Sequence, residues 1–329
     1  MIRPRIGFLG TGWIGRNRLE GLAAAGIADP VMFCDPDDHQ AEALIAAMPA
    51  IRRAPTFETM LDAGVEGVVI ATPSALHATQ ARAALAAGCA VFCQKPLGRD
   101  ASEVETVIAA AREADRLLGL DLSYRHCVAS RAVRDLVRGG ALGRVHAVDL
   151  VFHNAYGPDK DWFRDPRLSG GGCVIDLGVH LVDLAGWVLG PRRVEAVSSH
   201  LMAGGKLLPP DPKEVEDFAL ATILLVDGCV VRLACSWNLH AGMDAMIEAV
   251  FHGEVGDAVF RNVGGSFYDF AAEWRRGTSR EVLARPPDAW GGRAIVDWAR
   301  RLAQGARFDA EALCFLEVAR VLDQIYGRL

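Results

Sequence analysis

The stretch "RIGFLGTGWIGRNRLEGLAAAG" (residues 5–26) decides the fold of this chain. Its apolar start has the composition of a buried strand, and its second half has the apolar spacing of a helix. Between the two stand the three glycines of a GxGxxG pattern, Gly10, Gly12 and Gly15. Asp35 ends the next apolar run, twenty residues after the last of these glycines. In this context the pattern predicts a loop that holds a dinucleotide pyrophosphate, with Asp35 accepting from the adenosine ribose hydroxyls.

The rest of the first 123 residues repeats this alternation. Short apolar runs with the composition of strands lie at 31–35, 67–72, 90–94 and 117–123. Stretches with helical periodicity lie at 37–48, 74–88 and 101–114. Strands that alternate with helices predict βαβ units and a parallel sheet covered on both faces. We therefore expect an α/β Rossmann domain with a doubly wound parallel sheet over residues 1–123.

The pattern changes after residue 123. Following a helix at 128–139, longer strand-like stretches lie at 144–154, 192–202, 216–228, 229–240 and 245–254, and helices at 291–304 and 309–327 close the chain. Asp227-Gly228, between two β-rich runs, indicates a hairpin. These features predict an α+β domain over residues 124–329 with a large, open, mainly antiparallel sheet arranged as a meander. The C-terminal helices are expected to pack back on the Rossmann domain.

Composition and charge limit the partners. The 329 residues are 51% hydrophobic and 23% charged, with a net charge of -6, which argues against nucleic acid or an anionic membrane as a partner. The eight cysteines lie mostly in apolar runs and form no CxxC pair, as in a protein of a reducing compartment. The N-terminus leads directly into a strand pattern, and no apolar stretch of transmembrane length lacks charges. We expect a cytoplasmic protein.

Four ordered motifs carry a family resemblance: GxGxxG, "ATPSALH" (71–77), "QKP" (94–96) and "GGGCVIDLGVH" (170–180). Together they make the chain resemble the Gfo/Idh/MocA oxidoreductases over essentially its whole length. The resemblance implies a Rossmann domain followed by a sheet domain, and hydride transfer between a nicotinamide cofactor and a secondary alcohol of a sugar, polyol, inositol or sugar derivative. It also implies that Lys95 is the catalytic lysine, that Asp176 binds the substrate, and that His180 is the acid/base.

The residues themselves support these roles. Asp176 and His180 stand four apart in an otherwise apolar run, so they share one helix face with Asp183. A carboxylate in an apolar helix needs a hydrogen-bonding or ionic partner, or it serves a function such as binding a ligand. Lys95 follows an apolar strand, and open α/β sheets bind ligands at the carboxyl ends of their strands.

The expected cofactor contacts extend beyond the three glycines to Trp13, Ile14, Asp35, Thr72, Pro73, His77, Gln94 and Lys95. The resemblance places His77 near the cofactor, although a role at the start of a helix is nearly as well supported. The family usually has glutamate where this chain has Gln94, which removes a negative charge beside Lys95. Asp37 and Asp38 follow Asp35, and we expect no arginine nearby to hold a 2′-phosphate, so we expect NAD rather than NADP.

The loop "HNAYGPDKDWFRDPRL" (153–168) mixes aromatic and polar side chains. Aromatic rings stack on the C–H face of a sugar while polar groups bind its hydroxyls, so Asn154, Tyr156 and Trp162 are candidate substrate ligands beside Lys95, Asp176 and His180. A loop held together by its own aromatic residues is the alternative. Arg125 is a further candidate ligand, preferred over its neighbour Tyr124.

Two other functions are compatible with the sequence. A metal-dependent hydrolase or lyase would use Asp176 and His180 as metal ligands, with His153 or His240 as the third ligand. The dinucleotide motif argues against this function. A non-catalytic dinucleotide sensor would not need an acid/base pair.

The sheet of the second domain indicates how the chain assembles. The strands at 216–226 and 229–239 carry apolar side chains on both faces. Because monomers avoid large exposed apolar patches, this pattern predicts a homodimer or homotetramer packed through the sheet.

Overall fold

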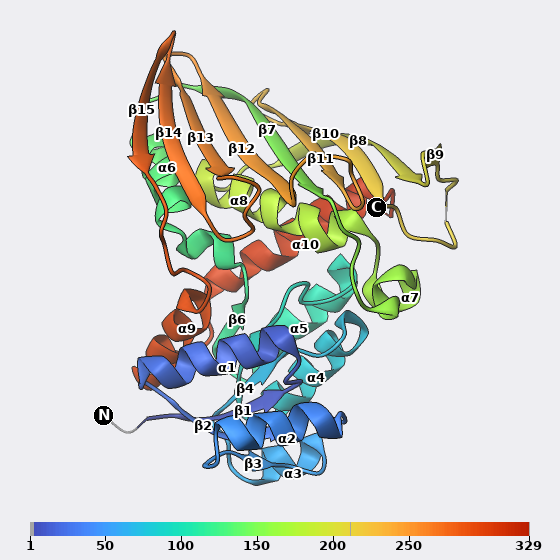
Figure 1. Ribbon diagram of the computed structural model, residues 1–329, viewed down its shortest axis with the longest axis vertical. Coiled ribbons are helices and arrows are strands. Elements are labelled where there is room, and N and C mark those ends of the chain that lie inside the picture. The colour runs from blue at the N-terminus through green and yellow to red at the C-terminus, as the bar shows by residue number, and fades with distance from the viewer. Residues whose placement is uncertain (1–2, 211, 329) are drawn as a thin grey trace. The chain divides into compact units, whose positions relative to one another are not determined.

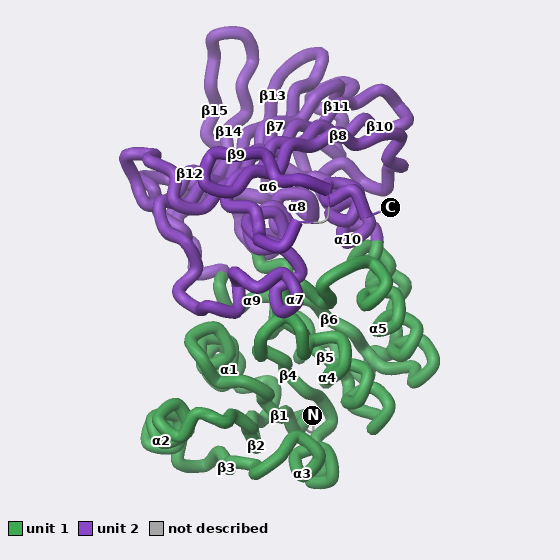
Figure 2. Tube along the Cα trace, turned by 90° about the vertical axis from the view of Figure 1, so that its right-hand side faces the viewer, with its two compact units in different colours: residues 1–123, 291–316 green, residues 124–290, 317–329 purple. Residues whose placement is uncertain are grey.

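The computed structural model describes residues 3–210 and 212–328 and divides the chain into two compact units (Figure 2). The first contains Met1–Ser123 and Gly291–Leu316, and the second contains Tyr124–Trp290 and Glu317–Leu329. A late segment of the chain therefore belongs to the first unit.

The first unit contains a six-stranded parallel sheet in the order β3-β2-β1-β4-β5-β6 (Figure 1). Its strands are β1 (Arg5–Leu9), β2 (Asp29–Cys34), β3 (Arg52–Arg53), β4 (Gly67–Ile70), β5 (Ala90–Cys93) and β6 (Leu118–Leu120). Every residue of β4 and β5 is buried, as in a sheet covered on both faces. The strand order reverses between β1 and β4, where such sheets bind ligands. The predicted doubly wound parallel sheet is confirmed.

The helices of this unit are α1 (Trp13–Ala25), α2 (Asp38–Ala47), α3 (Phe57–Asp62), α4 (Ser74–Ala86), α5 (Ala101–Glu113) and α9 (Arg293–Ala303). Strand β3 and helix α3 were not predicted, because elements of two and six residues are too short to show a period. Strand β6 ends at Leu120, earlier than predicted, and a 3₁₀ turn, η1 (Ser123–His126), follows.

Helix α9 completes the core of the first unit through Trp298, whose side chain is 3% exposed. A Cβ atom on Gly67 of β4 or on Gly119 of β6 would lie 2.8 or 2.7 Å from the Trp298 ring. The ring also lies 5.7 Å from that of Phe92, between centroids. The two strand glycines therefore leave the space that the indole fills, and a segment nearly 200 residues away in sequence closes the Rossmann core.

We predict that Trp298→Ala lowers the free energy of unfolding by about 3–5 kcal/mol, because it leaves a cavity in the core that the surrounding strands cannot move to fill. Urea denaturation followed by circular dichroism measures the change. Trp13→Ala, at a position 69% exposed, is the control and should change stability little. Equal effects of the two substitutions would contradict this account of the core.

The second unit contains a nine-stranded sheet in the order β15-β14-β13-β12-β7-β11-β10-β8-β9 (Figure 1). Its strands are β7 (Val145–Asn154), β8 (Val194–Ala203), β9 (Lys206–Leu207), β10 (Phe218–Leu225), β11 (Val230–Ser236), β12 (Ala245–Gly253), β13 (Asp257–Asn262), β14 (Phe270–Arg276) and β15 (Ser279–Ala284). The hairpin predicted at Asp227-Gly228 joins β10 to β11, and Gly228 has φ +83°. The mainly antiparallel sheet is confirmed.

The strand pattern predicted a simple meander, and that prediction is wrong. Strands β7 and β11 are parallel neighbours, and the other paired strands are antiparallel. The helical segment between β7 and β8 is the crossover that parallel strands require. It contains η2 (Asp161–Arg164), α7 (Pro166–Ser169), the π-helical turn η3 (Val174–Gly178) and α8 (Val179–Leu189).

Strands β13 to β15 fall in residues 255–290, where no strand was predicted. Charged residues interrupt the apolar pattern of these strands: Glu273 of β14 is 1% exposed and lies 2.9 Å from Arg261 of β13 and 2.8 Å from Arg275 of its own strand. The sequence therefore does not show the period-two alternation of these strands clearly.

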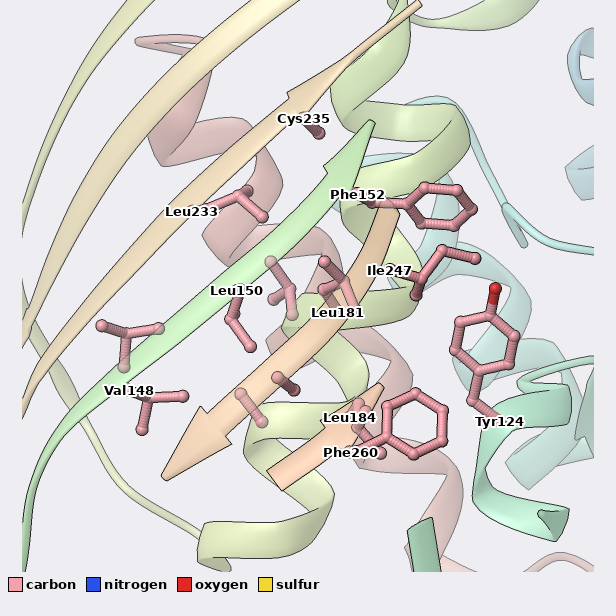
Figure 3. Packing of buried hydrophobic residues seen from close by; sticks show 14 of the residues in the cluster. Tyr124, Val148, Leu150, Phe152, Leu181, Leu184, Leu233, Cys235, Ile247 and Phe260 are labelled. Carbon is pink, nitrogen blue, oxygen red and sulfur yellow. The ribbon is translucent and has the colours of Figure 1, made fainter. Parts of the chain in front are cut away.

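One face of the sheet forms the core of the second unit with helices α6 (Val128–Arg138), α8 and α10 (Leu313–Ile325). Figure 3 shows Leu181 of α8 beside Leu150 of β7, and Leu184 of α8 beside Phe260 of β13. The helical stretch Pro166–Leu189 is long and apolar enough to cross a membrane, but 72% of its most apolar window is buried in this core.

The opposite face of the sheet is less apolar than the sequence suggested. It carries the apolar side chain of Leu220 of β10, which is 41% exposed. It also carries an ion pair, in which Arg232 of β11 donates two hydrogen bonds of 2.6 Å each to Asp149 of β7.

Candidate active site

Two of the three motif glycines are required by the packing of the first unit. Gly10 has φ +85°, and a Cβ atom there would lie 2.6 Å from the carbonyl oxygen of Ala71. A Cβ atom on Gly15 would lie 2.2 Å from the carbonyl oxygen of Gly10. These glycines allow the tight turn and the close contact between β1 and α1.

Gly12 is different, because no residue that the structure describes requires its lack of a side chain. Its φ is −58°, and a Cβ atom there would meet no atom of residues 3–210 and 212–328 within 4 Å. Gly12 is also the N-cap of α1, which has no side-chain cap and no acidic residue in its first turn. The open space and the uncapped amides of Trp13 and Ile14 fit a pyrophosphate that approaches the backbone closely.

Asp35 lies beside this loop and is tied to it. Its Oδ2 accepts from the Thr11 amide at 2.6 Å and from the Thr11 hydroxyl at 3.0 Å, and its Oδ1 accepts from the Asp37 amide at 2.9 Å. The sequence-based view that no arginine stands nearby is wrong. Arg53 donates to the Asp35 carbonyl oxygen at 2.8 Å, because β3 pairs with β2 and brings residue 53 next to residue 35.

His77 joins the ends of two strands at the same edge of the sheet. Its Nδ1 lies 2.6 Å from the carbonyl oxygen of Pro96, and its Nε2 lies 2.7 Å from that of Thr72. Burial lowers the pKa of His77, and the two carbonyl contacts oppose that shift. Pro73 occupies the N-cap position of α4. His77 therefore fixes the segment after β4 against the segment that contains Lys95.

Gln94 belongs to a buried network rather than to the surface of the site. Its Nε2 donates to Asp121 Oδ2 at 2.5 Å, and Arg18 of α1 donates to the same oxygen at 2.5 Å. Ser123 donates to the other oxygen of Asp121. Asp121 therefore places a negative charge beside Gln94, with Arg18 as its counter-ion. Lys95, the next residue, is half-buried, and its peptide bond to Pro96 is cis.

We predict that Gln94→Glu lowers the unfolding free energy by about 1–3 kcal/mol, because it replaces the donor to Asp121 with a second buried carboxylate. The double variant Gln94→Glu/Asp121→Asn restores one donor and one negative charge, so most of the loss should be recovered. Thermal and urea unfolding of both variants and of Asp121→Asn measures the cycle. Additive losses would mean that the two positions do not interact.

In the second unit, Asp176 and His180 stand out by their accessibility. From Gly171 to Ala185, every residue is buried except these two, which are partly exposed. Asp176 lies in the π-helical turn η3 rather than in the predicted α-helix, and its N–H donates to the Gly172 carbonyl at 3.0 Å. Trp237, directly after β11, donates its indole N–H to Asp176 Oδ2 at 3.0 Å.

The glycines before this turn are explained by Glu216, which is 2% exposed. Its carboxylate accepts from the amides of Gly172 at 3.0 and 3.1 Å and of Val174 at 2.9 Å, and from the Tyr326 hydroxyl at 2.8 Å. A Cβ atom on Gly172 would lie 1.9 Å from the Glu216 carbonyl oxygen, and one on Gly171 would lie 2.1 Å from the Tyr326 hydroxyl. Burial raises the pKa of Glu216, and these donors oppose the shift.

Tyr124, rather than Arg125, lies against the candidate acid/base. The rings of Tyr124 and His180 are 5.0 Å apart between centroids, and Phe152 of β7 lies 6.5 Å from the same imidazole. Figure 3 shows the Tyr124 side chain at the end of the apolar core near Phe152 and Ile247. Burial raises the pKa of Tyr124 well above its usual value, so its hydroxyl stays protonated.

Arg125 forms a buried ion pair with Asp183 instead of facing outward. Its Nε donates to Asp183 at 2.9 Å, and the two side chains are 13% and 2% exposed. Burial raises the pKa of Asp183, while the Arg125 charge lowers it. The predicted role of Arg125 as a substrate ligand has little support from this geometry.

The residues of the 153–168 loop bind one another and a neighbouring strand end. Asn154 Oδ1 accepts from the Tyr156 amide at 2.7 Å, and the Tyr156 hydroxyl donates to Asp244 at 2.5 Å. Trp162 stacks on Phe163 with centroids 3.8 Å apart. Since side chains alternate along a strand, Asn154 lies on the same face of β7 as Phe152, the face of His180.

The metal-site alternative lacks its third ligand. His153 points to the opposite face of β7 from Phe152 and bonds Ser236 at 2.8 Å, and His240 is exposed. Within residues 3–210 and 212–328, no three His, Cys, Asp or Glu side chains are grouped closely enough to hold a metal ion.

Comparison with known families agrees with these features. Residues 4–122 match the family described as "Oxidoreductase family, NAD-binding Rossmann fold", and residues 130–259 match "GFO/IDH/MocA C-terminal domain". The chain belongs to the Gfo/Idh/MocA family. It is therefore an NAD(P)-dependent oxidoreductase acting on CH–OH groups.

Several Gfo/Idh/MocA relatives are similar to this chain. It is 32% identical over 211 residues to a 1,5-anhydro-D-fructose reductase of Ensifer adhaerens, a match that covers 63% of this chain and 60% of that enzyme. It is 29% identical to the rhizopine catabolism protein MocA of Rhizobium meliloti, covering 92% and 96% of the two chains. An inositol 2-dehydrogenase of Rhizobium meliloti (strain 1021) is 26% identical, covering 78% and 76%.

Among solved structures, GenD2 from gentamicin A biosynthesis, in complex with NAD, superposes with a TM-score of 0.82. The identity is 25%, and the match covers 100% of this chain and 94% of GenD2. The fold of the Gfo/Idh/MocA proteins thus extends over the whole of this chain.

Sequence reasoning missed several residues that shape this Gfo/Idh/MocA site. Trp237 could have been found from the alternation along β11, which directs it to the inner face. Glu216 and Asp121 gave no signal, because each is a single acidic residue whose partners are distant in sequence. Arg53 was missed together with the two-residue strand that carries it.

Proposed function

We propose that this protein is an NAD-dependent dehydrogenase that transfers hydride between a secondary alcohol of a sugar, polyol, inositol or sugar derivative and the nicotinamide. The observation that carries the proposal is the pair Asp176 and His180, the two accessible residues in an otherwise buried helical segment. The names of the relatives, a 1,5-anhydro-D-fructose reductase and an inositol 2-dehydrogenase, support the substrate class. A panel of sugars, inositols and sugar acids with NAD, followed at the nicotinamide absorbance, tests it.

In this mechanism His180 takes the proton of the hydroxyl that is oxidised. Lys95 bonds the same oxygen and stabilises the negative charge that develops on it. Asp176, oriented by the Trp237 N–H, binds the substrate and favours the imidazolium that forms on His180. Bound NAD supplies the hydride acceptor. In the reverse direction His180 returns the proton to the product alkoxide.

Aromatic and polar groups of the second unit support a polyhydroxylated substrate. Asn154 shares the face of β7 that carries Phe152, and Tyr156 and Trp162 lie on the loop that follows. Tyr124, packed on the His180 ring, adds a protonated hydroxyl near the acid/base. Such a mixture of flat apolar rings and hydroxyl or amide groups binds sugars.

We predict that His180→Ala lowers kcat by about 10²–10⁴, the usual contribution of general acid–base catalysis, while NAD still binds. Lys95→Ala should lower kcat at least as much, because it removes stabilisation present mainly in the transition state. kcat/KM of the unmodified enzyme should fall as pH is lowered, since a protonated imidazole cannot accept a proton. Steady-state kinetics and calorimetric NAD titration measure these effects.

His146→Ala is the comparison variant, because this exposed histidine of β7 has no proposed part in binding or proton transfer, and kcat should stay unchanged. Near-full activity of both His180→Ala and Lys95→Ala on the preferred substrate would show that these residues have structural roles only.

We further propose that the protein is cytoplasmic and assembles as a homodimer or homotetramer through the outer face of the large sheet. Eight free cysteines, six of them buried, suit a reducing compartment. Leu220 and Met246, 41% and 40% exposed, lie on that face beside the Arg232–Asp149 pair.

Light scattering at micromolar concentration should therefore give a mass of two or four chains of 35.4 kDa. Leu220→Arg should shift the mass towards the monomer, since it places a charge on the packed face. A monomeric mass for the unmodified protein would contradict the proposed assembly.

A further inference from the structure

A cavity of about 460 Å³ lies at the carboxyl end of strands β2 and β3 in the first unit. It is lined by Cys34, Asp35, Pro36, Arg53 and Pro55. Because Asp35 is bonded to Thr11 of the glycine loop, this cavity adjoins the place where the pyrophosphate fits. It is therefore the space next to the adenosine ribose of a bound dinucleotide.

Arg53 is held in this cavity by the backbone of the sheet. Residue 53 pairs with Phe33, and the amide of Ala54 donates to the Phe33 carbonyl at 2.7 Å. The guanidinium donates to the Asp35 carbonyl at 2.8 Å and to the Asp38 carboxylate at 2.7 Å. These bonds use two of the five N–H donors of an arginine. The remaining donors stay on a side chain that is 33% exposed and already oriented.

The side-chain carboxylate of Asp35 has a different environment from the main-chain carbonyl oxygen of the same residue. It accepts three hydrogen bonds, two from Thr11 and one from the Asp37 amide. A carboxylate has about four acceptor positions, so a further one remains for a ribose hydroxyl. Its negative charge would repel a 2′-phosphate on that ribose.

The two groups have opposite preferences. An acidic residue at the end of the second strand selects NAD, and an arginine near the ribose accommodates the 2′-phosphate of NADP. Arginine binds phosphate through paired N–H donors in a fixed fork. This chain has both, with the arginine 18 residues beyond the acid and on the neighbouring strand.

We propose that Arg53 is a 2′-phosphate ligand already in place, and that the charge of Asp35 is what keeps NADP out. Loss of that charge then opens the site to NADP without any added arginine. The inference concerns cofactor selectivity only. It rests on the dinucleotide binding of the proposed function and does not depend on the roles of Lys95 or His180.

Calorimetric titration of the whole protein with NAD and NADP tests this. The unmodified protein should bind NAD more tightly. Asp35→Asn keeps the shape of the side chain and removes its charge, so the ratio Kd(NADP)/Kd(NAD) should fall at least about tenfold. Adding Arg53→Gln should return the ratio towards its original value. Arg52→Gln, at the adjacent exposed arginine outside the cavity, is the matched control and should leave the Asp35→Asn ratio unchanged.

Each result decides the proposal. An unchanged ratio in Asp35→Asn, or a gain that survives Arg53→Gln, would overturn it. If Asp35→Asn fails to fold, Asp35→Ser replaces it, because its hydroxyl can still accept a hydrogen bond from Thr11 and carries no charge. That variant should also tighten NADP binding, and the gain should disappear with Arg53→Gln. An unmodified protein that binds neither dinucleotide would contradict the proposed function as well, whereas normal NAD binding with no effect of Arg53 would contradict this inference alone.

Discussion

The buried carboxylate of Glu216 is the interaction on which the candidate catalytic segment depends. It accepts from the amides of Gly172 and Val174, the first N–H groups of a helical segment, which have no partners within the helix itself. A residue just before β10, more than 40 positions later in the chain, thus caps this helix start. The contact is so close that neither Gly171 nor Gly172 can carry a side chain. The orientation of Asp176 in the following turn is set by this contact.

Buried charge is balanced differently at each place in this protein. Asp121 is matched by Arg18 and by the neutral donor Gln94, Asp183 by Arg125, and Glu216 by backbone amides and a tyrosine hydroxyl. Each arrangement satisfies the rule that a polar group out of water needs hydrogen-bond partners. Asp176 and His180 differ because they remain partly accessible, which a group that must contact a substrate requires.

The environment of Gln94 is decided by the fold rather than by its neighbours along the chain. The sequence alone shows an uncharged side chain beside Lys95 at position 94. Asp121, at the end of the neighbouring strand, accepts from both Gln94 and Arg18, so a carboxylate with its own counter-ion lies beside Gln94. The same geometry links α1, which begins at the glycine loop, to the strand end that carries Lys95. The cofactor loop and the lysine are therefore held in one rigid network of the first unit.

The sequence by itself determined those features that depend on neighbours along the chain. Periodicity was sufficient for the doubly wound sheet, for the β10–β11 hairpin and for the general form of the second sheet. Spacing was sufficient for the glycine loop of Gly10, Gly12 and Gly15. The order of the motifs, through the family resemblance, predicts roles for Lys95, Asp176 and His180, and those roles stay a prediction. The structure adds that no described residue occupies the space beside Gly12.

Only the tertiary structure decided which side chains meet. The parallel pairing of β7 with β11, the ion pair of Arg125 with Asp183, and the packing of Tyr124 on His180 all join residues distant in sequence. Arg53 reaches Asp35 because a two-residue strand, too short to leave a periodic signal, pairs with β2. Hydrogen bonds and ion pairs act over a few ångströms of space. A pattern along the chain therefore predicts the elements, whereas the partners of each buried polar group follow only from the way those elements pack.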